Sequence, residues 1–428
     1  MYAPARIDAR ICWTSRAIDP KMAAVELLDI RDAAERIASG IYVSPCPHSG
    51  ALSEKTGSTI HCKLDYLQRT GSFKERGARN ALLQLAPERR ARGVIAASAG
   101  NHALGLAYHA SLLDIPVTVV MPHYAPLTKV SNCQSLGARV VLFGDDIGQA
   151  RLKADELAAD EALTYINGFD DPAVIAGQGT MGLEILEQVP SVDAIVVPVG
   201  GAGLIAGIAL AVKAQKPEIR VIGVEPENAA SLGAAFEAGE PVHVTPTPTL
   251  ADGLAVPKVG PNGFRVAREH VDRLVTVNER AIARAILHLV ELEKSVVEGA
   301  GAVGLAACLD GLPELEGKRV VLPLCGGNID TPILGRIIER GLAADYRLCR
   351  FDATISDRPG GLAKFSAALA DEGASIRQIN HDRAFAGAEI DQVAVNCIVE
   401  TRDAEHIERL KQRLLDDGFA VHFYGWND

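Results

Sequence analysis

A lysine at position 74 lies where a lysine is unfavourable, in or near the first turn of a predicted helix. Gly71 and Ser72 predict a turn with a helix N-cap, and residues 78–85 predict the helix that follows. A helix N-terminus carries partial positive charge, so the pKa of an amine there should fall, and further if Phe73 helps to bury it. A neutral amine is a nucleophile for carbonyl groups. Because an isolated lysine is usually a solvated surface residue, this interpretation needs partners elsewhere in the chain.

Three loops could supply such partners. Each follows an apolar stretch that predicts a strand, and ligands of open α/β sheets bind at the carboxyl ends of strands. The first loop consists of Ser98, Ala99, Gly100, Asn101 and His102. Its N–H groups and polar side chains could hold a substrate carboxylate or a ring oxygen. Taken alone, these residues fit a capped turn with a structural histidine equally well.

The second loop opens a predicted helix and consists of Gly200, Gly201, Ala202, Gly203 and Leu204. Bare backbone N–H groups at a helix N-terminus suit a phosphate. These glycines, continued by Gly207, also approximate a dinucleotide-binding fingerprint, with Glu225 at the end of the next strand as the acid for the ribose. A nicotinamide-dependent oxidoreductase is therefore an alternative interpretation.

The third loop, Cys325-Gly-Gly-Asn328, ends the last apolar strand of this region. Cys325 could be a nucleophile, a weak hydrogen-bond partner or a packed thiol. No basic residue adjoins it, which weakens the nucleophile interpretation. We expect a weak hydrogen-bond partner.

Length and composition predict a globular protein with a large core, because 48% of the 428 residues are hydrophobic. The net charge of −11 and the lack of Lys/Arg-rich runs argue against a nucleic-acid partner and favour a small-molecule ligand. The eight cysteines form no CxxC pair and no Cys/His cluster, which argues against a disulfide framework and a zinc site. A cytoplasmic location fits this cysteine usage.

Residues 194–212 are uncharged over 19 positions, nominally enough to cross a membrane. Pro198 and four glycines divide this stretch into a strand, a loop and a helix start, so no membrane span is predicted. Residues 1–21 contain acidic residues and no apolar core, so we expect an N-terminal extension rather than a secretory signal.

From residue 93 onward, apolar runs alternate with helical patterns, which predicts an α/β fold with a parallel sheet covered on both faces. Strands are expected at residues 58–64, 94–97, 117–121, 139–143, 164–166, 194–199, 221–225, 275–277 and 319–324. Residues 42–52 contain two prolines and are expected to form a loop. After residue 346 the predicted order becomes βαββαβ, with strands at 348–356, 375–384, 391–400 and 419–423, which is a ferredoxin-like α+β domain.

In combination and in this order, the motifs resemble those of fold-type II (tryptophan synthase beta-like) pyridoxal-phosphate enzymes, most closely the threonine dehydratase (threonine ammonia-lyase) family. The motifs are Thr70-Gly-Ser-Phe-Lys-Glu-Arg-Gly-Ala78, Ser98-Ala-Gly-Asn-His102, Phe169-Asp-Asp-Pro172 with Gly177-Gln-Gly-Thr180, Gly200-Gly-Ala-Gly-Leu204 and Cys325-Gly-Gly-Asn328. The resemblance implies a catalytic region at residues 22–344, with a small subdomain of about residues 65–165 inserted in a large one. Residues 345–428 resemble an ACT domain.

The resemblance implies that Lys74 anchors pyridoxal 5'-phosphate and removes the α-proton of the substrate. It also implies that Phe73 packs by the cofactor ring, Asn101 bonds its phenolic oxygen, loop 200–204 cradles its phosphate and Cys325 faces its ring nitrogen. Ala202 replaces the family's usual glycine, but its methyl group removes no N–H donor, so phosphate binding should survive. The implied reaction removes water from L-threonine or L-serine and yields a 2-oxoacid and ammonia, and a neutral thiol at the ring nitrogen favours this elimination over transamination.

Serine racemase and hydroxyaspartate ammonia-lyase share the fold and are the nearest alternatives. In the racemase a serine usually stands where this chain has Ala99, which has no proton to give, so a dehydratase is the better prediction. The racemase family also carries a divalent cation. Glu225 and the carbonyl of Ala229 match its site, but Ser231 stands in place of a second carboxylate.

In the ACT superfamily amino acids bind at the first strand-to-helix loop, which makes Asp357, Gly360, Gly361 and Asn380 candidate effector contacts. Such regulation would be allosteric, as in isoleucine biosynthesis, and in that superfamily it usually involves two paired domains. The single copy here suggests either pairing between protomers of a homodimer or homotetramer, or loss of strict isoleucine control. A dimerisation module without any ligand is the alternative.

Overall fold

The computed structural model describes residues 25–382 and 391–424 and divides into two compact units. Unit 1 contains residues up to 285 together with 289–329, and unit 2 contains residues 286–288 and those from 330 onward. The expected N-terminal extension, residues 1–21, lies outside the described residues. Among the described residues, no helix is both long and apolar enough to span a membrane.

The elements before residue 330 alternate between strands and helices, as expected for an α/β fold. The strands are β1 (His48–Ser49), β2 (Thr59–Lys63), β3 (Val94–Ala97), β4 (Val117–Met121), β5 (Arg139–Leu142), β6 (Thr164–Tyr165), β7 (Ala194–Pro198), β8 (Arg220–Pro226), β9 (Arg273–Val277) and β10 (Arg319–Pro323). The helices are α1 (Leu27–Ile37), α2 (Gly50–Thr56), α3 (Lys74–Leu83), α4 (Pro87–Arg92), α5 (Asn101–Leu112), α6 (Leu127–Ser135), α7 (Ile147–Asp160), α8 (Pro172–Gln188), α9 (Gly203–Lys213), α10 (Ser231–Ala238), α11 (Pro261–His270), α12 (Glu279–Leu292) and α13 (Gly299–Asp310).

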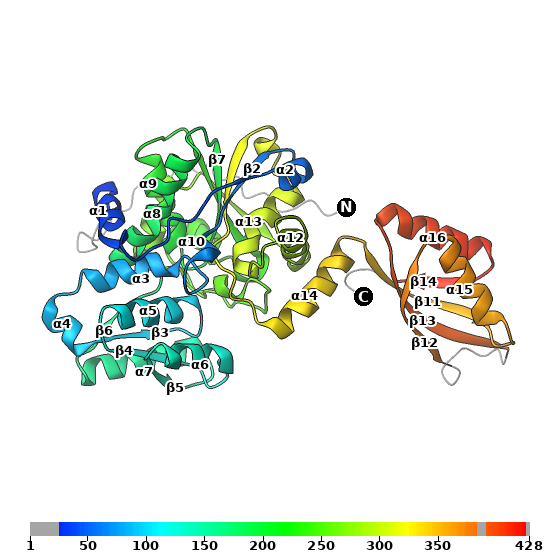
Figure 1. Cartoon of the computed structure of the whole chain (residues 1–428), viewed down its shortest axis with the longest axis horizontal. Helices are drawn as coiled ribbons and strands as arrows, with labels where there is room; N and C mark the ends of the chain where they lie inside the picture. Colours follow the sequence, from blue (N-terminus) through cyan, green and yellow to red (C-terminus); the bar gives the residue numbers. More distant parts are fainter. Residues whose placement is uncertain (1–24, 383–390, 425–428) are drawn as a thin grey trace. The chain divides into compact units, whose positions relative to one another are not determined.

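Unit 1 contains two sheets, which Figure 1 shows as separate groups of strands. The larger sheet has the order β1-β2-β10-β7-β8-β9 and is parallel except for the pairing of β1 with β2. The smaller sheet has the order β5-β4-β3-β6 and is entirely parallel. Because both sheets are parallel, their loops gather at the carboxyl ends of the strands.

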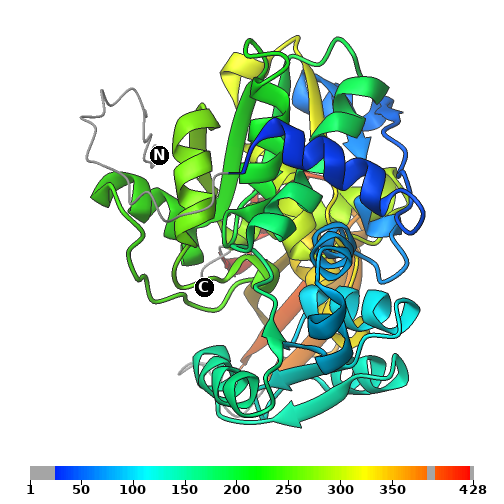
Figure 2. The ribbon, with the colours of Figure 1, turned by 90° about the vertical axis from the view of Figure 1, so that its left-hand side faces the viewer.

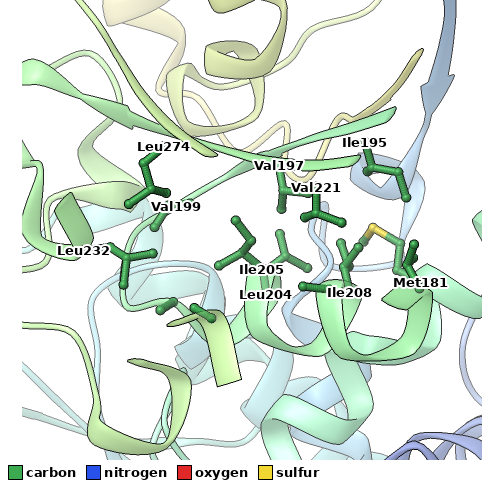
Figure 3. Close-up of a cluster of buried hydrophobic side chains, with 14 of the residues drawn as sticks. Met181, Ile195, Val197, Val199, Leu204, Ile205, Ile208, Val221, Leu232 and Leu274 are labelled. Atoms are coloured by element: carbon green, nitrogen blue, oxygen red, sulfur yellow. The ribbon is translucent and has the colours of Figure 1, made fainter. Parts of the chain in front are cut away.

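The core of the larger sheet forms between β7, β8 and the helices α8 and α9. Figure 3 shows Ile205 and Ile208 of α9 beside Val197 and Val221 of the sheet, all fully buried. Helix α9 carries apolar residues on every face because α1 packs across α8 and α9 on the other side, through Ile30 and its neighbours (Figure 2). This burial fixes the start of α9, and with it the glycine loop.

The prediction of a loop over residues 42–52 is wrong in its second half. Strand β1 begins at His48, and α2 begins at Gly50. Ser49 caps α2, because its hydroxyl accepts the N–H of Leu52 at 3.1 Å, and Gly57 ends it in the left-handed conformation at φ 71°. The two prolines therefore limit structure only before residue 48.

Unit 2 contains an antiparallel sheet of strand order β12-β13-β11-β14. From β11 onward its strands and helices follow one another in the predicted βαββαβ order. Its elements are α14 (Thr331–Ala344), β11 (Leu348–Ser356), α15 (Gly361–Asp371), β12 (Ser375–Asp382), β13 (Gln392–Glu400), α16 (Ala404–Asp416) and β14 (Ala420–Phe423). The strands bury alternate residues, such as Phe351 and Ala353, against Phe365 of α15. The last two residues of the strand predicted to end at 384 lie outside the described residues.

Candidate active site

Lys74 is the first residue of α3, and the turn before it is fixed from several directions. Gly71 adopts φ 79°, a conformation that favours glycine. The N–H of Thr70 donates to the carboxylate of Glu75, and the N–H of Phe73 donates to the carbonyl of Cys325 at 2.9 Å. The lysine therefore projects from a rigid turn.

A buried ion-pair network anchors α3 two residues beyond Lys74. Arg76 is fully buried and donates to Asp65 through Nε and Nη2 at 2.8 and 2.7 Å. Its Nη1 donates to Glu184 of α8 at 2.6 Å, and Lys63 of β2 donates to the same carboxylate. Sequence reasoning missed this network, which ties the helix of Lys74 to both the large sheet and α8.

The ammonium of Lys74 is held in a site that favours its neutral form. Its Nζ donates to the carbonyl of Gly168 at 2.7 Å and lies 5.1 Å from the centroid of the Phe73 ring. Burial lowers the pKa of Lys74 to about 8, while the carboxylate of Glu298 opposes this shift. A usable fraction of the amine is therefore neutral near neutral pH, as a nucleophile requires.

The loop of Cys325 is joined to the turn of Lys74. Gly327 donates its N–H to the carbonyl of Gly71 at 3.0 Å, and Asn328 donates its side-chain amide to the carbonyl of Thr70 at 2.7 Å. The Cys325 thiol is buried and donates to the carbonyl of Pro323 at 3.3 Å. Burial raises the pKa of Cys325 well above its ordinary value, so the group is a neutral thiol and a poor nucleophile.

Asn101, the first residue of α5, connects this loop to a residue that sequence reasoning missed. Its Oδ1 accepts from Asn328 at 2.9 Å, and its Nδ2 donates to Oε1 of Glu298 at 2.7 Å. Glu298 is buried at the N-cap of α13, and burial together with the charge of Asp252 raises its pKa to about 7. The available signal was that Glu298 is the one charged residue between 295 and 309.

The backbone N–H groups of the glycine loop, residues 200–204, have no partner within the described part of the chain. These residues lead into α9. Ala202 adopts the left-handed conformation at φ 72°, and its methyl carbon lies on the side of Gly263 in α11. The methyl group therefore packs against α11 and removes no donor from the loop. Unpaired N–H groups at a helix N-terminus suit a phosphate.

A short segment, 168–170, brings the glycine loop to Lys74. The carbonyl of Gly168 accepts the hydrogen bond from the amine of Lys74, and Phe169 is the next residue in the chain. A Cβ at Gly201 would lie 2.3 Å from the ring of Phe169, and one at Gly203 would lie 2.1 Å from its carbonyl oxygen. Only glycine allows this approach, so these two positions place the open N–H groups beside the lysine.

The loop 98–102 contains Asn101, but the side chain of its last residue, His102, is directed toward Ile166 and Gly168. Its Nε2 donates to the carbonyl of Ile166 at 3.1 Å, and its ring packs against Gly168. Burial, with the charge of Lys74, lowers the pKa of His102 to about 4, so it is neutral. Ser98 accepts the N–H of Gly100 at 3.3 Å, and a Cβ added at Gly100 would meet nothing within 4 Å. The open space therefore borders Gly100, not the His102 ring.

Glu225, the acid of the predicted cation site, is not surrounded by further metal ligands among the described residues. Both of its oxygens accept backbone N–H groups at the start of α10, from Leu232 at 2.7 Å and Gly233 at 2.9 Å. Burial raises the pKa of Glu225 to about 7. Among the described residues, no three His, Cys, Asp or Glu side chains gather as metal ligands, and Ser231 offers only a buried hydroxyl. The same capping role takes Glu225 away from any ribose, which removes the acid of the dinucleotide fingerprint.

The candidate effector residues of unit 2 divide into two places. Asp357, Gly360 and Gly361 follow β11 directly, and Asp357 donates its N–H to the carbonyl of Asp391 at 2.9 Å. Asn380 pairs with Asn396, which pairs with Asp352, four residues before the end of β11. At about 3.4 Å per residue, Asn380 therefore lies roughly 14 Å along the strand direction from the end of β11.

Comparisons with known proteins agree with this geometry. Residues 37–326 match the family model described as pyridoxal-phosphate dependent enzyme. The L-threonine ammonia-lyase of Thermotoga maritima is 43% identical over 401 residues, which cover 94% of this chain and 100% of that protein. The structure of processed threonine deaminase isoform 2 from Solanum lycopersicum matches with a TM-score of 0.71 and 35% identity, over 75% of this chain and 93% of that chain. Serine racemase from Dictyostelium discoideum matches with a TM-score of 0.68 and 35% identity, over 72% of this chain and 100% of that chain.

Proposed function

Because the chain belongs to the family of pyridoxal-phosphate dependent enzymes, we propose that it is a threonine ammonia-lyase. It removes water from L-threonine, and from L-serine, and releases 2-oxobutanoate or pyruvate together with ammonia. The observation that carries this proposal is the 43% identity with the L-threonine ammonia-lyase of Thermotoga maritima, which extends over the whole of that protein and therefore over both units of this chain.

The residues around Lys74 fit pyridoxal phosphate. The unpaired N–H groups of residues 200–204 suit its phosphate, the partly neutral amine of Lys74 suits its carbonyl carbon, and the amide of Asn101 suits its phenolic oxygen. Phe73, directly before the lysine, offers its ring as a packing surface. When bound, this cofactor supplies an electron sink for negative charge at the α-carbon of an amino acid.

Lys74 has a second role as the base. Its Nζ takes the proton from the α-carbon of the substrate, and a pKa near 8 suits a group that must accept and return a proton at neutral pH. The loop of Ser98, Ala99, Gly100 and Asn101 holds the substrate carboxylate through its N–H groups, beside the open space at Gly100. His102 supports this arrangement from behind by packing against Gly168.

Cys325 and Ala99 direct the outcome of the reaction. The thiol stays protonated and cannot act as a counter-ion for a positive ring nitrogen, so the carbanion is weakly stabilised and loses its β-hydroxyl quickly. Ala99 offers no proton on the face opposite Lys74, so return of a proton there is disfavoured. Both features favour elimination over transamination or racemisation.

Replacement of Lys74 tests the proposal. Lys74→Ala should keep the fold and lose at least about a thousandfold in ammonia release from L-threonine, since the anchor and the base are removed together. Lys55→Ala, at an exposed position of α2, is the control and should leave the rate unchanged. Substantial residual turnover by Lys74→Ala would show that another group performs the chemistry.

Racemisation of serine is a second candidate activity, favoured by the match to serine racemase from Dictyostelium discoideum. Steady-state rates with L-threonine, L-serine and threo-3-hydroxyaspartate separate the candidates. Chiral chromatography measures the D-serine that is formed from L-serine. The proposal expects the highest kcat/KM for L-threonine and little D-serine. Faster formation of D-serine than of pyruvate would favour the racemase, and a preference for hydroxyaspartate would favour that ammonia-lyase.

We propose that residues 345–428, which lie within unit 2, form an ACT-like regulatory domain in which Asp357, Gly360 and Gly361 contact an amino-acid effector, in a homodimer or homotetramer. The βαββαβ order of its antiparallel sheet supports the domain type. We also propose a cytoplasmic location, which the seven described cysteines support because all of them are free.

A further inference from the structure

Two histidines face each other at the edge of the larger sheet. His48 of β1 lies directly opposite His61 of β2 in the antiparallel pair, and their ring centroids are 5.4 Å apart at an interplanar angle of 55°. Figure 1 shows β2 beside α2, the helix that follows β1. His48 is exposed and His61 is partly exposed, so solvent reaches both rings.

The hydrogen bonds of His48 fix its tautomer. Its Nε2 lies 3.2 Å from the hydroxyl oxygen of Ser53. That hydroxyl donates its own proton to the carbonyl of Ser49 at 2.5 Å and accepts the N–H of Ile60 at 2.9 Å. Because the single hydroxyl proton is already used, Nε2 of His48 must be the donor. The lone pair of the neutral ring is therefore on Nδ1.

The same reasoning applies to His61. Its Nδ1 lies 3.4 Å from the carbonyl oxygen of Cys46, which can only accept, so Nδ1 carries the proton and the lone pair is on Nε2. Burial, the charge of His48 and the charge of Arg319 lower the pKa of His61, against the opposing effect of this hydrogen bond, which keeps the ring neutral. Metal-binding histidines usually donate their second ring nitrogen to a carbonyl or similar acceptor in this way.

The ring separation is close to that of two imidazoles on one metal ion. With metal–nitrogen bonds of about 2.1 Å, each centroid lies about 3.2 Å from the metal, so a cis arrangement separates the centroids by roughly 4.5 to 5.2 Å. The observed separation of 5.4 Å slightly exceeds this range. From this geometry we propose that His48 and His61 form a two-histidine site for a borderline divalent transition-metal ion such as Ni²⁺ or Cu²⁺. Imidazole nitrogen is a preferred ligand of both ions.

Water would complete the coordination, because no group of three His, Cys, Asp or Glu ligands occurs among the described residues. Arg319, whose guanidinium donates to the carbonyl of Ser191 at 2.9 Å, places a positive charge near His61 and keeps the affinity moderate. An ion bound here would join the two-residue edge strand β1 to β2, and so stabilise the folded state over the unfolded one.

Isothermal titration of the loaded, full-length enzyme with NiCl₂ tests this site. His48→Ala and His61→Ala should each weaken the tightest Ni²⁺ binding event by at least about tenfold, because one imidazole cannot chelate. The control is His243→Ala, at an exposed position outside any strand, and it should bind as the wild type does.

Thermal unfolding with and without NiCl₂ gives a second readout. A rise in the melting temperature of the wild type that is absent from both single variants supports the site, and His243→Ala should keep that rise. Wild-type Ni²⁺ affinity in either His48→Ala or His61→Ala, or no Ni²⁺ binding by the wild type, would overturn the proposal. Circular dichroism checks that each variant is folded before titration.

Discussion

Glu298 is the residue through which the Asn101 amide and the Cys325 loop are held together. Its carboxylate accepts from Asn101, its own N–H donates to the carbonyl of Gly326 at 3.0 Å, and it acts electrostatically on Lys74. A Cβ at Gly326 would lie 2.3 Å from Oε1 of Glu298, so the contact is tight. The orientation of Asn101 toward its ligand thus depends on a buried acid about 200 positions away in the sequence.

The pH dependence of stability should report Glu298 directly. Burial raises the pKa of its folded state to about 7 from an ordinary value of 4.5, so the protonated form is favoured on folding. The associated stability is fully present below pH 4.5 and is lost as the pH rises through 7. Glu298→Gln does not titrate, so its free energy of unfolding relative to wild type should rise by about 3 kcal/mol between pH 4.5 and 8.

Denaturant unfolding across this pH range measures the difference, with the exposed Glu88→Gln as the control. The control should follow the wild type at every pH. A flat difference between Glu298→Gln and the wild type would mean that Glu298 does not change its protonation state with folding in this range.

The residue types in the sequence predicted the chemistry of the site, but they did not predict which distant residues contact one another. Lys74 and Cys325 were identifiable because each is an unusual residue at the end or start of an element. Glu298 and Glu75 were not, since an acid at a helix start is also an ordinary cap. Their roles depend on contacts with Asn101 and His109, which no local pattern encodes.

At the scale of elements, two loop glycines should differ in the effect of substitution, one on stability and the other on substrate binding. A Cβ at Gly203 would lie 2.1 Å from the backbone of Phe169, whereas a Cβ at Gly100 would meet nothing. Gly203→Ala should therefore lose about 2–3 kcal/mol or more of stability. Gly100→Ala should change stability by less than about 0.5 kcal/mol but raise KM for L-threonine, because its methyl group enters the open space.

Unfolding curves and steady-state kinetics of both variants check this prediction. Equal stability losses would show that the space at Gly100 is filled in solution. An unchanged KM for Gly100→Ala would place the substrate away from this loop.

The cap of α10 makes a prediction about metals. Both oxygens of Glu225 already accept N–H groups of that helix, and no second or third acidic ligand gathers beside it among the described residues, so we expect no catalytic cation there. Dialysis against EDTA should leave the rate of ammonia release unchanged, and added Mg²⁺ or Ca²⁺ should not raise it. Loss of activity on chelation, restored by Mg²⁺, would revive the cation site.

The strands followed from the sequence more fully than the short helices did. Continuous apolar runs such as Val94–Ala97 and Val117–Met121 were predicted at the observed bounds, because buried parallel strands leave few polar positions. The helices α2, α4 and α11 were missed, since each is short or mainly polar and depends on a cap or on packing.

At the scale of the whole molecule, the two units differ in what they share with relatives. Serine racemase from Dictyostelium discoideum is matched over its full length by 72% of this chain. A protein of this fold therefore exists that has no counterpart of the other residues of this chain. The domain boundary that we propose, at residues 344–345, retains α14 with the catalytic region, although this helix belongs to the second compact unit.

Removal of residues 347–428 should leave a folded enzyme that releases ammonia from L-threonine at a rate close to that of the full chain. Any effect of an added amino acid on the rate of the full chain should disappear in the shortened one. Steady-state rates of both proteins, each with single amino acids added in turn, measure this. A folded but inactive shortened protein would show that unit 2 is needed for catalysis itself.

The central claim is that the amine of Lys74 is the covalent anchor of pyridoxal phosphate, and chemical trapping tests it most directly. The loaded enzyme is reduced with borohydride, digested and mapped by peptide mass spectrometry. The expected result is one modified peptide, in which the phosphopyridoxyl group is on Lys74. Modification of a different lysine, or no modified peptide from a protein that turns over L-threonine, would contradict the claim.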